Sequence, residues 1–293
     1  MNIFLDKPSS FDFLCTVNSH GWTDLAPFSF DQSESSLSYV FSGSIYKKPI
    51  SAKLTDLPDK ICIETEKISA AQSQLLVKRV AYVLRFDDNF SDFYEITKRK
   101  KEFRWINRIF AGRLIRADTV FEDLIKTICT TNCSWNLTIS MIRNLVEHLG
   151  QPVSDGSKSF PLPEALASKD ERFFREVIRT GYRAPYFVEL SRSISDGKLD
   201  PEQWLDSEIS TPELKKQIKA IKGVGEYAAE TLLKLLGRYE GLALDSWLRA
   251  EFYNKYCNGE KCDDAEIADF YEEFGKFRGL AIWLDMSKRW IIK

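Results

Sequence analysis

The sequence predicts a mainly α-helical protein with a small α+β module, built on an antiparallel sheet, at its N-terminus. Three observations lead to this fold class. Short stretches with partial apolar alternation, separated by turn residues, occupy residues 1 to about 68. From residue 93 onward, apolar residues recur at helical spacing. A glycine-centred break at 223–225 then separates two helical patterns. We therefore divide the chain into an N-terminal module, 1–92, and a helical domain, 93–293.

The composition is that of an ordinary soluble globular protein. Of the 293 residues, 44% are hydrophobic and 29% are charged. No apolar run approaches the ~20 residues that span a bilayer, and the first residues lack the pattern of a signal peptide. The six cysteines are scattered, which is typical of reduced thiols. We expect an intracellular protein without a membrane partner, in the cytoplasm or nucleoid if the source is bacterial.

The N-terminal module is predicted from three strands and one helix. The strands are expected at 11–17, 37–41 and 61–64, where apolar and polar residues partly alternate. The helix is expected at 70–86, because Leu76, Val80 and Val83 or Leu84 fall on one face. Strands followed by a helix favour a small α+β unit.

The helical domain opens with two well-marked patterns. Apolar residues from Phe121 to Ile128 share one face, and Asp118 or Thr119 can cap that helix. A second pattern runs from Ile139 to Leu149, and Gly150 ends it. The C-terminal helices are rich in aromatic residues, most of which we expect in the core.

Residues 212–236 are predicted to form two helices joined by a glycine hairpin. Ser210 or Thr211 caps the first helix, and Gly223-Val224-Gly225 breaks the pattern, with both glycines free to adopt positive φ. Backbone N–H groups at the start of the second helix then lack partners. Such a helix start is an anion site that suits a phosphate.

A single acid, Asp245, follows the hairpin at a fixed distance. It lies twenty positions after Gly225 (245 − 225 = 20) and directly after the apolar run Gly241-Leu242-Ala243-Leu244. A helical pattern starts at this point, so Asp245 caps a helix, supplies a reactive carboxylate, or does both.

The hairpin and the spaced acid together resemble the helix-hairpin-helix (HhH-GPD) DNA glycosylases, whose hairpin reads Leu-Pro-Gly-Val-Gly where this chain has 221–225. The resemblance implies a helical glycosylase domain with the hairpin at 212–236. It implies that Gly223, Val224, Gly225 and Lys222 bind DNA phosphates, and that Asp245 drives cleavage of the bond between base and sugar. The loop before Asp245 lacks the proline that the family usually has there.

Three further segments resemble members of the same superfamily. Residues 85–88 are similar to a segment that closes the N-terminal module in the 3-methyladenine DNA glycosylase II group. Residues 128–132 resemble the Ile-Cys-Ser-Ser-Asn stretch of 8-oxoguanine DNA glycosylases, which implies that Asn132 fills the gap left by an extruded base. The alternative is that Asn132 caps a helix. Residues 181–186 resemble a Gly-Tyr-Arg-Ala-x-Tyr segment that is mainly structural in that family.

The resemblance also predicts the kind of glycosylase. Members that also nick the strand carry a lysine two positions after the second hairpin glycine, where this chain has Tyr227. A phenol forms no Schiff base, so we predict a monofunctional enzyme without AP-lyase activity. Tyr227 and Trp283 are the expected base-stacking residues. Stacking favours alkylated bases, and an oxidised purine such as 8-oxoguanine is the alternative, although Gly279 stands where that lineage reads the base with a glutamine.

The expected partner is double-stranded DNA that contains a damaged base, bound by a monomer in base excision repair. The basic segment 98–116, with eight basic residues and one acid, either follows the DNA backbone or is a solvated face. No metal is expected, since only Cys257 and Cys262 follow Asp245, too few for the iron–sulfur cluster of some members. The family often binds a monovalent cation through hairpin carbonyls. A rival hypothesis is a non-catalytic helix-hairpin-helix module that binds damaged DNA.

Overall fold

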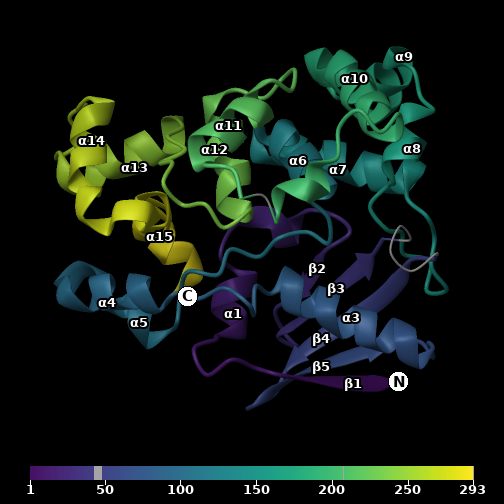
Figure 1. The fold of residues 1–293 in the computed structure, drawn as a ribbon, viewed down its shortest axis with the longest axis horizontal. Helices are drawn as coiled ribbons and strands as arrows, with labels where there is room; N and C mark the ends of the chain where they lie inside the picture. Colours follow the sequence, from purple (N-terminus) through teal and green to yellow (C-terminus); the bar gives the residue numbers. More distant parts are fainter. Residues whose placement is uncertain (43–47, 207, 293) are drawn as a thin grey trace.

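The computed structural model describes residues 1–42, 48–206 and 208–292. It consists of helices with one antiparallel sheet near the N-terminus, and so confirms the predicted fold class (Figure 1). The strands run β1 (Asn2–Asp6), β2 (Ser29–Asp31), β3 (Ser36–Phe41), β4 (Ile50–Asp56) and β5 (Lys60–Thr65). Their order across the sheet is β1-β5-β4-β3-β2, with β1 in register from Asn2 against Glu64 to Asp6 against Lys60.

The predicted strand at 11–17 is wrong, because this segment contains helix α1 (Phe13–Val17). The Asp12 side chain caps the helix by accepting from the Cys15 N–H at 2.7 Å. Phe13, Cys15 and Val17 are all buried, so the alternation reflects burial within a short helix. The strands at 37–41 and 61–64 are confirmed, whereas β1, β2 and β4 were not predicted.

Helix α3 (Ala70–Val83) confirms the helix predicted at 70–86, and its buried residues are Leu76, Val80 and Val83. Arg85 follows it within the segment that resembled the glycosylase II group. Its fully buried guanidinium donates to the Leu235 carbonyl at 2.7 Å and to the Tyr239 hydroxyl at 2.8 Å. This arginine therefore fastens the end of the N-terminal module to the helix that follows the glycine hairpin.

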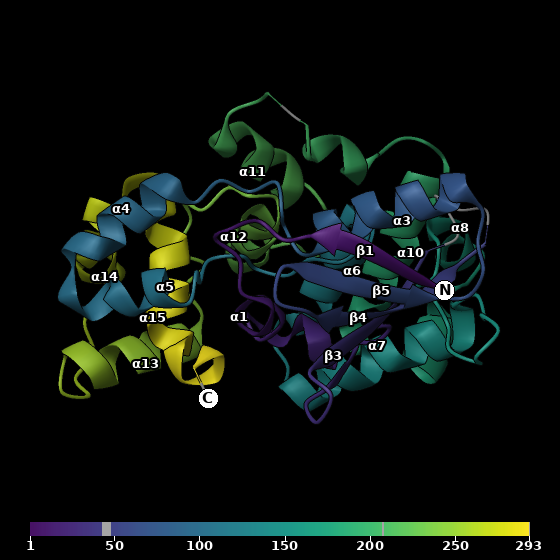
Figure 2. The ribbon, with the colours of Figure 1, turned by 90° about the horizontal axis from the view of Figure 1, so that it is seen from below.

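Two helices between residues 91 and 108 lie beside the C-terminal helices. In Figures 1 and 2, α4 (Ser91–Arg99) and α5 (Arg104–Arg108) lie next to α15 (Arg278–Ile291), on the side away from the sheet. Lys100 and Glu273 form an ion pair across this contact. The hydrophobic core is continuous from the sheet to α15.

Helix α6 (Val120–Thr130) runs through the centre of the protein, and every residue from 120 to 129 is buried. Its buried acids receive hydrogen bonds from the N-terminal module. The Tyr39 hydroxyl donates to Glu122 at 2.7 Å, and the Trp22 indole donates to Asp123 at 2.6 Å. These buried hydrogen bonds fix how the module docks on the helical domain.

The remaining helices surround α6 and carry the hairpin. Thr119 caps α6, one of the two caps that the sequence allowed, and Gly150 ends α7 as predicted. Among the described residues, no helix combines the length and the apolar character needed to cross a bilayer. The longer helices are α7 (Trp135–Leu149), α10 (Ala184–Ser195), α11 (Thr211–Lys219), α12 (Glu226–Leu235), α13 (Ser246–Tyr256) and α14 (Asp264–Phe270), and the short ones are α8 (Pro163–Ala167) and α9 (Glu171–Phe173).

Candidate active site

The glycine hairpin connects α11 to α12, and Ser210 caps α11 by accepting from the Glu213 N–H. Gly223 has φ of +89°, and a Cβ added to it would lie 2.3 Å from the Tyr186 ring. Glycine is required here for both reasons. The expectation of positive φ at Gly225 is wrong, since its φ is −88° and it serves as the N-cap of α12. It offers no capping side chain, which leaves the first N–H groups of α12 available.

The groups predicted to bind phosphate differ in exposure. Val224 is buried, while Gly225 and Lys222 are exposed. The Lys222 ammonium lies 3.3 Å from the Glu189 carboxylate in a solvent-exposed ion pair that contributes little to stability. Lys222 can therefore exchange this partner for a phosphate.

Asp245 is the N-cap of α13, as one of the two sequence hypotheses required. Its Oδ1 accepts from the Leu248 N–H at 2.7 Å, and its side chain is partly exposed. Within the part of the chain that the structure describes, no hydrogen bond reaches Oδ2. The cap therefore fixes the carboxylate and leaves its second oxygen for chemistry.

The loop before Asp245 is held by tethers that sequence reasoning missed. Ala243, with φ of +52°, donates its N–H to Glu230 at 2.6 Å. Lys234 donates to the Leu242 carbonyl at 2.9 Å. On the other side, a Cβ added to Gly279 would lie 1.9 Å from the Gly241 carbonyl oxygen, so α15 packs directly on the loop backbone. These contacts set where the Asp245 carboxylate lies.

Asp245 lines a cavity of about 800 Å³, together with Tyr227 and Trp283. The structure thus brings the predicted acid and both predicted stacking residues to one cavity. Five of the seven tryptophans contribute to its wall. The full lining is Asn18, His20, Gly21, Trp22, Thr23, Asp24, Leu114, Thr130, Cys133, Trp135, Thr138, Tyr227, Thr231, Lys234, Leu235, Ala243, Asp245, Trp247, Leu248, Trp283, Arg289 and Trp290.

The two predicted stacking residues are held differently. The Trp283 indole donates to the Ser19 carbonyl at 2.8 Å, and its ring centroid lies 5.9 Å from that of Trp247. Burial raises the pKa of the Tyr227 phenol, and the negative charge of Asp245 raises it further. Tyr227 is therefore a neutral phenol close to the acid.

A wall of the cavity comes from residues 18–24, to which the sequence gave no role. The Ser19 hydroxyl accepts from the Ile115 N–H at 3.0 Å, and His20 Nε2 donates to the Ile115 carbonyl at 2.5 Å. Burial lowers the pKa of His20 to about 4, so this imidazole is neutral at pH 7. With Trp22 bonded to Asp123, the segment is fixed at three points.

Asn132, the predicted gap-filling residue, does not line the cavity. It is exposed at the turn between α6 and α7, with φ of +48°, and its amide lies 3.4 Å from the Tyr182 hydroxyl. The buried Arg183 holds this turn, since its guanidinium donates to the Ile128 and Thr131 carbonyls. The segment at 181–186 is thus structural, as expected, and it positions Asn132 at the surface.

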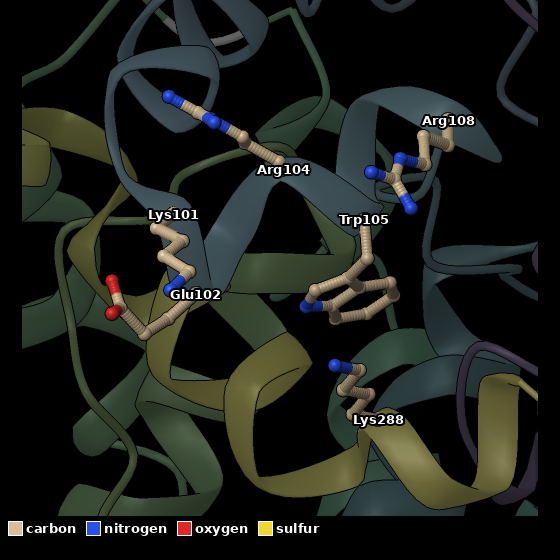
Figure 3. A pocket seen from close by; sticks show the side chains of 6 residues that line it. All are labelled: Lys101, Glu102, Arg104, Trp105, Arg108 and Lys288. Carbon is tan, nitrogen blue, oxygen red and sulfur yellow. The ribbon is translucent and has the colours of Figure 1, made fainter.

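The basic segment 98–116 is divided between core and surface. Arg113 and Arg116 are buried and donate to backbone carbonyls, so they are structural. The segment's exposed residues Lys101, Glu102, Arg104 and Arg108, with the buried Trp105 and with Lys288 of α15, line a second cavity of about 420 Å³ (Figure 3). Lys288 lies under the Trp105 ring, with Nζ 5.4 Å from its centroid. This second cavity has one acid and one aromatic residue among four basic side chains, and Asp245 does not line it.

No family model matches the sequence. A probable N-glycosylase/DNA lyase of Methanothermobacter thermautotrophicus is 24% identical over 225 residues, which cover 69% of this chain and 70% of that protein. The 3-methyladenine DNA glycosylase of Archaeoglobus fulgidus has a similar structure, with a TM-score of 0.79 at 18% identity over 98% of both chains. The apo 8-oxoguanine glycosylase/lyase of Clostridium acetobutylicum gives a TM-score of 0.76 at 16% identity, over 97% of this chain and 95% of that one. The chain has the fold of these DNA glycosylases, as the sequence predicted.

Proposed function

We propose that this protein is a monofunctional DNA N-glycosylase, which binds double-stranded DNA as a monomer, extrudes a damaged base and leaves an abasic site. The observation that carries the proposal is the position of Asp245. Its partly exposed carboxylate lies at the start of α13, in an aromatic cavity of about 800 Å³. Tyr227, two residues after the glycine hairpin, lines the same cavity. A base can reach such a carboxylate only by leaving the duplex.

Asp245 supplies the chemistry in this proposal. Breaking the bond between base and sugar develops positive oxocarbenium character on the sugar. A fixed carboxylate beside that charge stabilises the transition state more than the ground state, which raises the rate. Oδ1 is occupied by the Leu248 N–H, so Oδ2 faces the sugar and orients the attacking water.

The hairpin and its surroundings hold the DNA. The hairpin Gly223-Val224-Gly225 presents the uncapped N–H groups at the start of α12 to a phosphate, and Lys222 adds a positive charge. The Val224 N–H is itself used within the hairpin, where it donates to the Ile221 carbonyl at 3.0 Å. Asn132 is exposed and occupies the gap that the extruded base leaves. These contacts are independent of base identity, so the cavity decides which base is released.

The absence of lyase activity follows from Tyr227, because a phenol cannot form the Schiff base that strand cleavage needs. Borohydride trapping on DNA that contains a damaged base tests this point. We expect no covalent adduct, and an adduct would show that one of the lysines acts as a nucleophile.

The lining of the cavity supports two classes of substrate, for different reasons. Stacking against Tyr227 and Trp283 favours an alkylated base, since electron-poor rings gain most from aromatic walls. An oxidised purine is the second candidate. Lys234 favours it, because this lysine lines the cavity and its positively charged ammonium can donate to a base carbonyl.

The decisive experiment uses duplexes with 7-methylguanine, hypoxanthine, uracil or 8-oxoguanine, followed by alkaline cleavage at abasic sites. We expect release of at least one base by the wild type. Asp245→Asn keeps the helix cap and removes the charge, so release should fall by about 10³-fold with DNA binding retained. Binding without release by the wild type would instead favour a non-catalytic module.

A further inference from the structure

A lysine reaches the same cavity from helix α12. Tyr227, Thr231 and Lys234 recur at positions i, i+4 and i+7 of this helix, so they share one face, and all three line the cavity. Only 5% of Lys234 is exposed, although it belongs to a residue type that is almost never fully buried. A buried ammonium in a base pocket calls for an explanation.

The tether to the loop explains only part of this placement. Lys234 Nζ donates one proton to the Leu242 carbonyl at 2.9 Å. An ammonium has three protons, and no other hydrogen bond from Nζ exists among the described residues. Two of its protons therefore have no acceptor among the described residues.

The charge on Lys234 persists at neutral pH. Burial lowers the pKa of Lys234 to about 8, while the negative charges of Glu230 and Asp245 oppose the shift. Glu230 is already engaged by the Ala243 N–H and by Lys215, at 2.6 and 2.7 Å. The ammonium is thus positively charged at pH 7, and no ion-pair partner within 4 Å neutralises it among the described residues.

We propose that the Lys234 ammonium determines which damaged base the cavity accepts: it selects neutral, carbonyl-bearing purines, such as oxidised or deaminated bases, and rejects cationic alkylated purines. This inference rests on the proposed glycosylase function. Two positive charges repel strongly in a buried site, where water screens them little. A carbonyl oxygen of a neutral base instead accepts a charge-assisted hydrogen bond.

A purely structural lysine would behave differently. If Lys234 only held the Leu242 carbonyl, its loss would displace the Asp245 loop and slow the release of every base by a similar factor. The ratio of kcat/KM between two bases separates the two roles. Displacement of the loop lowers both values by a similar factor and leaves their ratio unchanged.

The test compares 8-oxoguanine with 7-methylguanine in one duplex sequence. Both retain the O6 carbonyl of guanine, but only 7-methylguanine is cationic. In Lys234→Met we expect the ratio of kcat/KM, 8-oxoguanine over 7-methylguanine, to fall by about tenfold or more. The exposed Lys198, which pairs with Asp196, provides the control Lys198→Met, in which the ratio should not change.

Other outcomes separate the inference from the proposed function. An unchanged ratio in Lys234→Met, or a wild type that prefers 7-methylguanine to both 8-oxoguanine and hypoxanthine, overturns the inference and leaves the glycosylase intact. Failure of the wild type to release any base overturns the proposed function itself. If Lys234→Met does not fold, Lys234→Gln keeps a donor without the charge and should show the same fall in the ratio.

Discussion

Two walls of the cavity are built in different ways. One wall carries the proposed catalytic acid and is called the catalytic wall; it consists of the α12 face with Tyr227, Thr231 and Lys234 and of residues 243–248. Its tethers from α12 to the loop reach only 8 to 13 residues along the chain. The N-terminal wall consists of residues 18–24, and its hydrogen bonds reach Ile115, Asp123 and Trp283, between 95 and 264 residues away.

The two walls also differ in charge. The catalytic wall keeps Lys234 protonated at pH 7 inside the protein, whereas the N-terminal wall keeps His20 neutral. Burying a charge costs free energy, so the catalytic wall loses stability by holding an ammonium inside the protein. The N-terminal wall adds shape and aromatic surface without that cost.

The largest expected effect on stability tests how rigid the catalytic wall is. In Gly279→Ala the new Cβ would meet backbone oxygens of Gly241 and Tyr239, at 1.9 and 2.7 Å. Backbone cannot move away as a side chain can, so we expect a loss of about 3 to 4 kcal/mol in the free energy of unfolding. Displacement of the loop should also lower base release by about 10²-fold. Urea unfolding and the excision assay measure both, and a variant with wild-type stability would contradict this packing.

The same contrast explains what the sequence could predict. The hairpin, the capping Asp245 and the helices from 118 onward follow from local patterns, so they were predicted. Residues 18–24 were missed because their role arises from contacts with segments around 115 and 283 that no local pattern encodes.

Burial in the core also explains why the strand predicted at 11–17 is wrong. The alternation in 11–17 suggested a strand, but Asp12 caps a helix there and the surrounding core buries several of its faces. The burial of Lys234 could not be predicted, because spacing along α12 does not reveal it.

The second prediction concerns the pH dependence of the N-terminal wall. The pKa of His20 is about 4 in the folded protein and 6.5 when unfolded, so the unfolded chain binds more protons between these values. The contribution of neutral His20 to the free energy of unfolding is therefore fully present above pH 6.5. It is lost as the pH falls towards 4, by at most about 3 kcal/mol. His20→Gln should flatten this part of the profile, whereas the change at the exposed His148, His148→Gln, should leave it as in the wild type. Equal profiles for His20→Gln and wild type would show that His20 titrates normally.

The third prediction concerns the charge on the catalytic wall. The pKa of Lys234 is about 8 in the folded protein and 10.5 when unfolded, so the unfolded chain binds more protons between these values. The folded protein therefore loses stability as the pH falls from 10.5 to 8. At pH 7 the buried charge costs about 3 kcal/mol, against about 1 to 3 kcal/mol for the hydrogen bond to Leu242. We expect Lys234→Met to be about 1 kcal/mol more stable than wild type at pH 7, and this gain should shrink between pH 8 and 10. A clearly less stable variant would mean that the tether outweighs the buried charge.

The smallest effect is expected at Gly21 of the N-terminal wall, where, as at Gly279, an added Cβ would meet a close neighbour. In Gly21→Ala the new Cβ would lie 2.3 Å from Cζ2 of Trp135, a closer contact than most glycines here would make. Trp135 is 37% exposed, however, and its indole bond to Asp24 is a surface contact of 3.1 Å, so the ring can turn aside. We expect a loss below about 1 kcal/mol and a changed KM with little change in kcat. A loss as large as in Gly279→Ala would show that the two walls are equally rigid, because a side chain at the cavity mouth would then resist displacement as firmly as the backbone beneath Asp245.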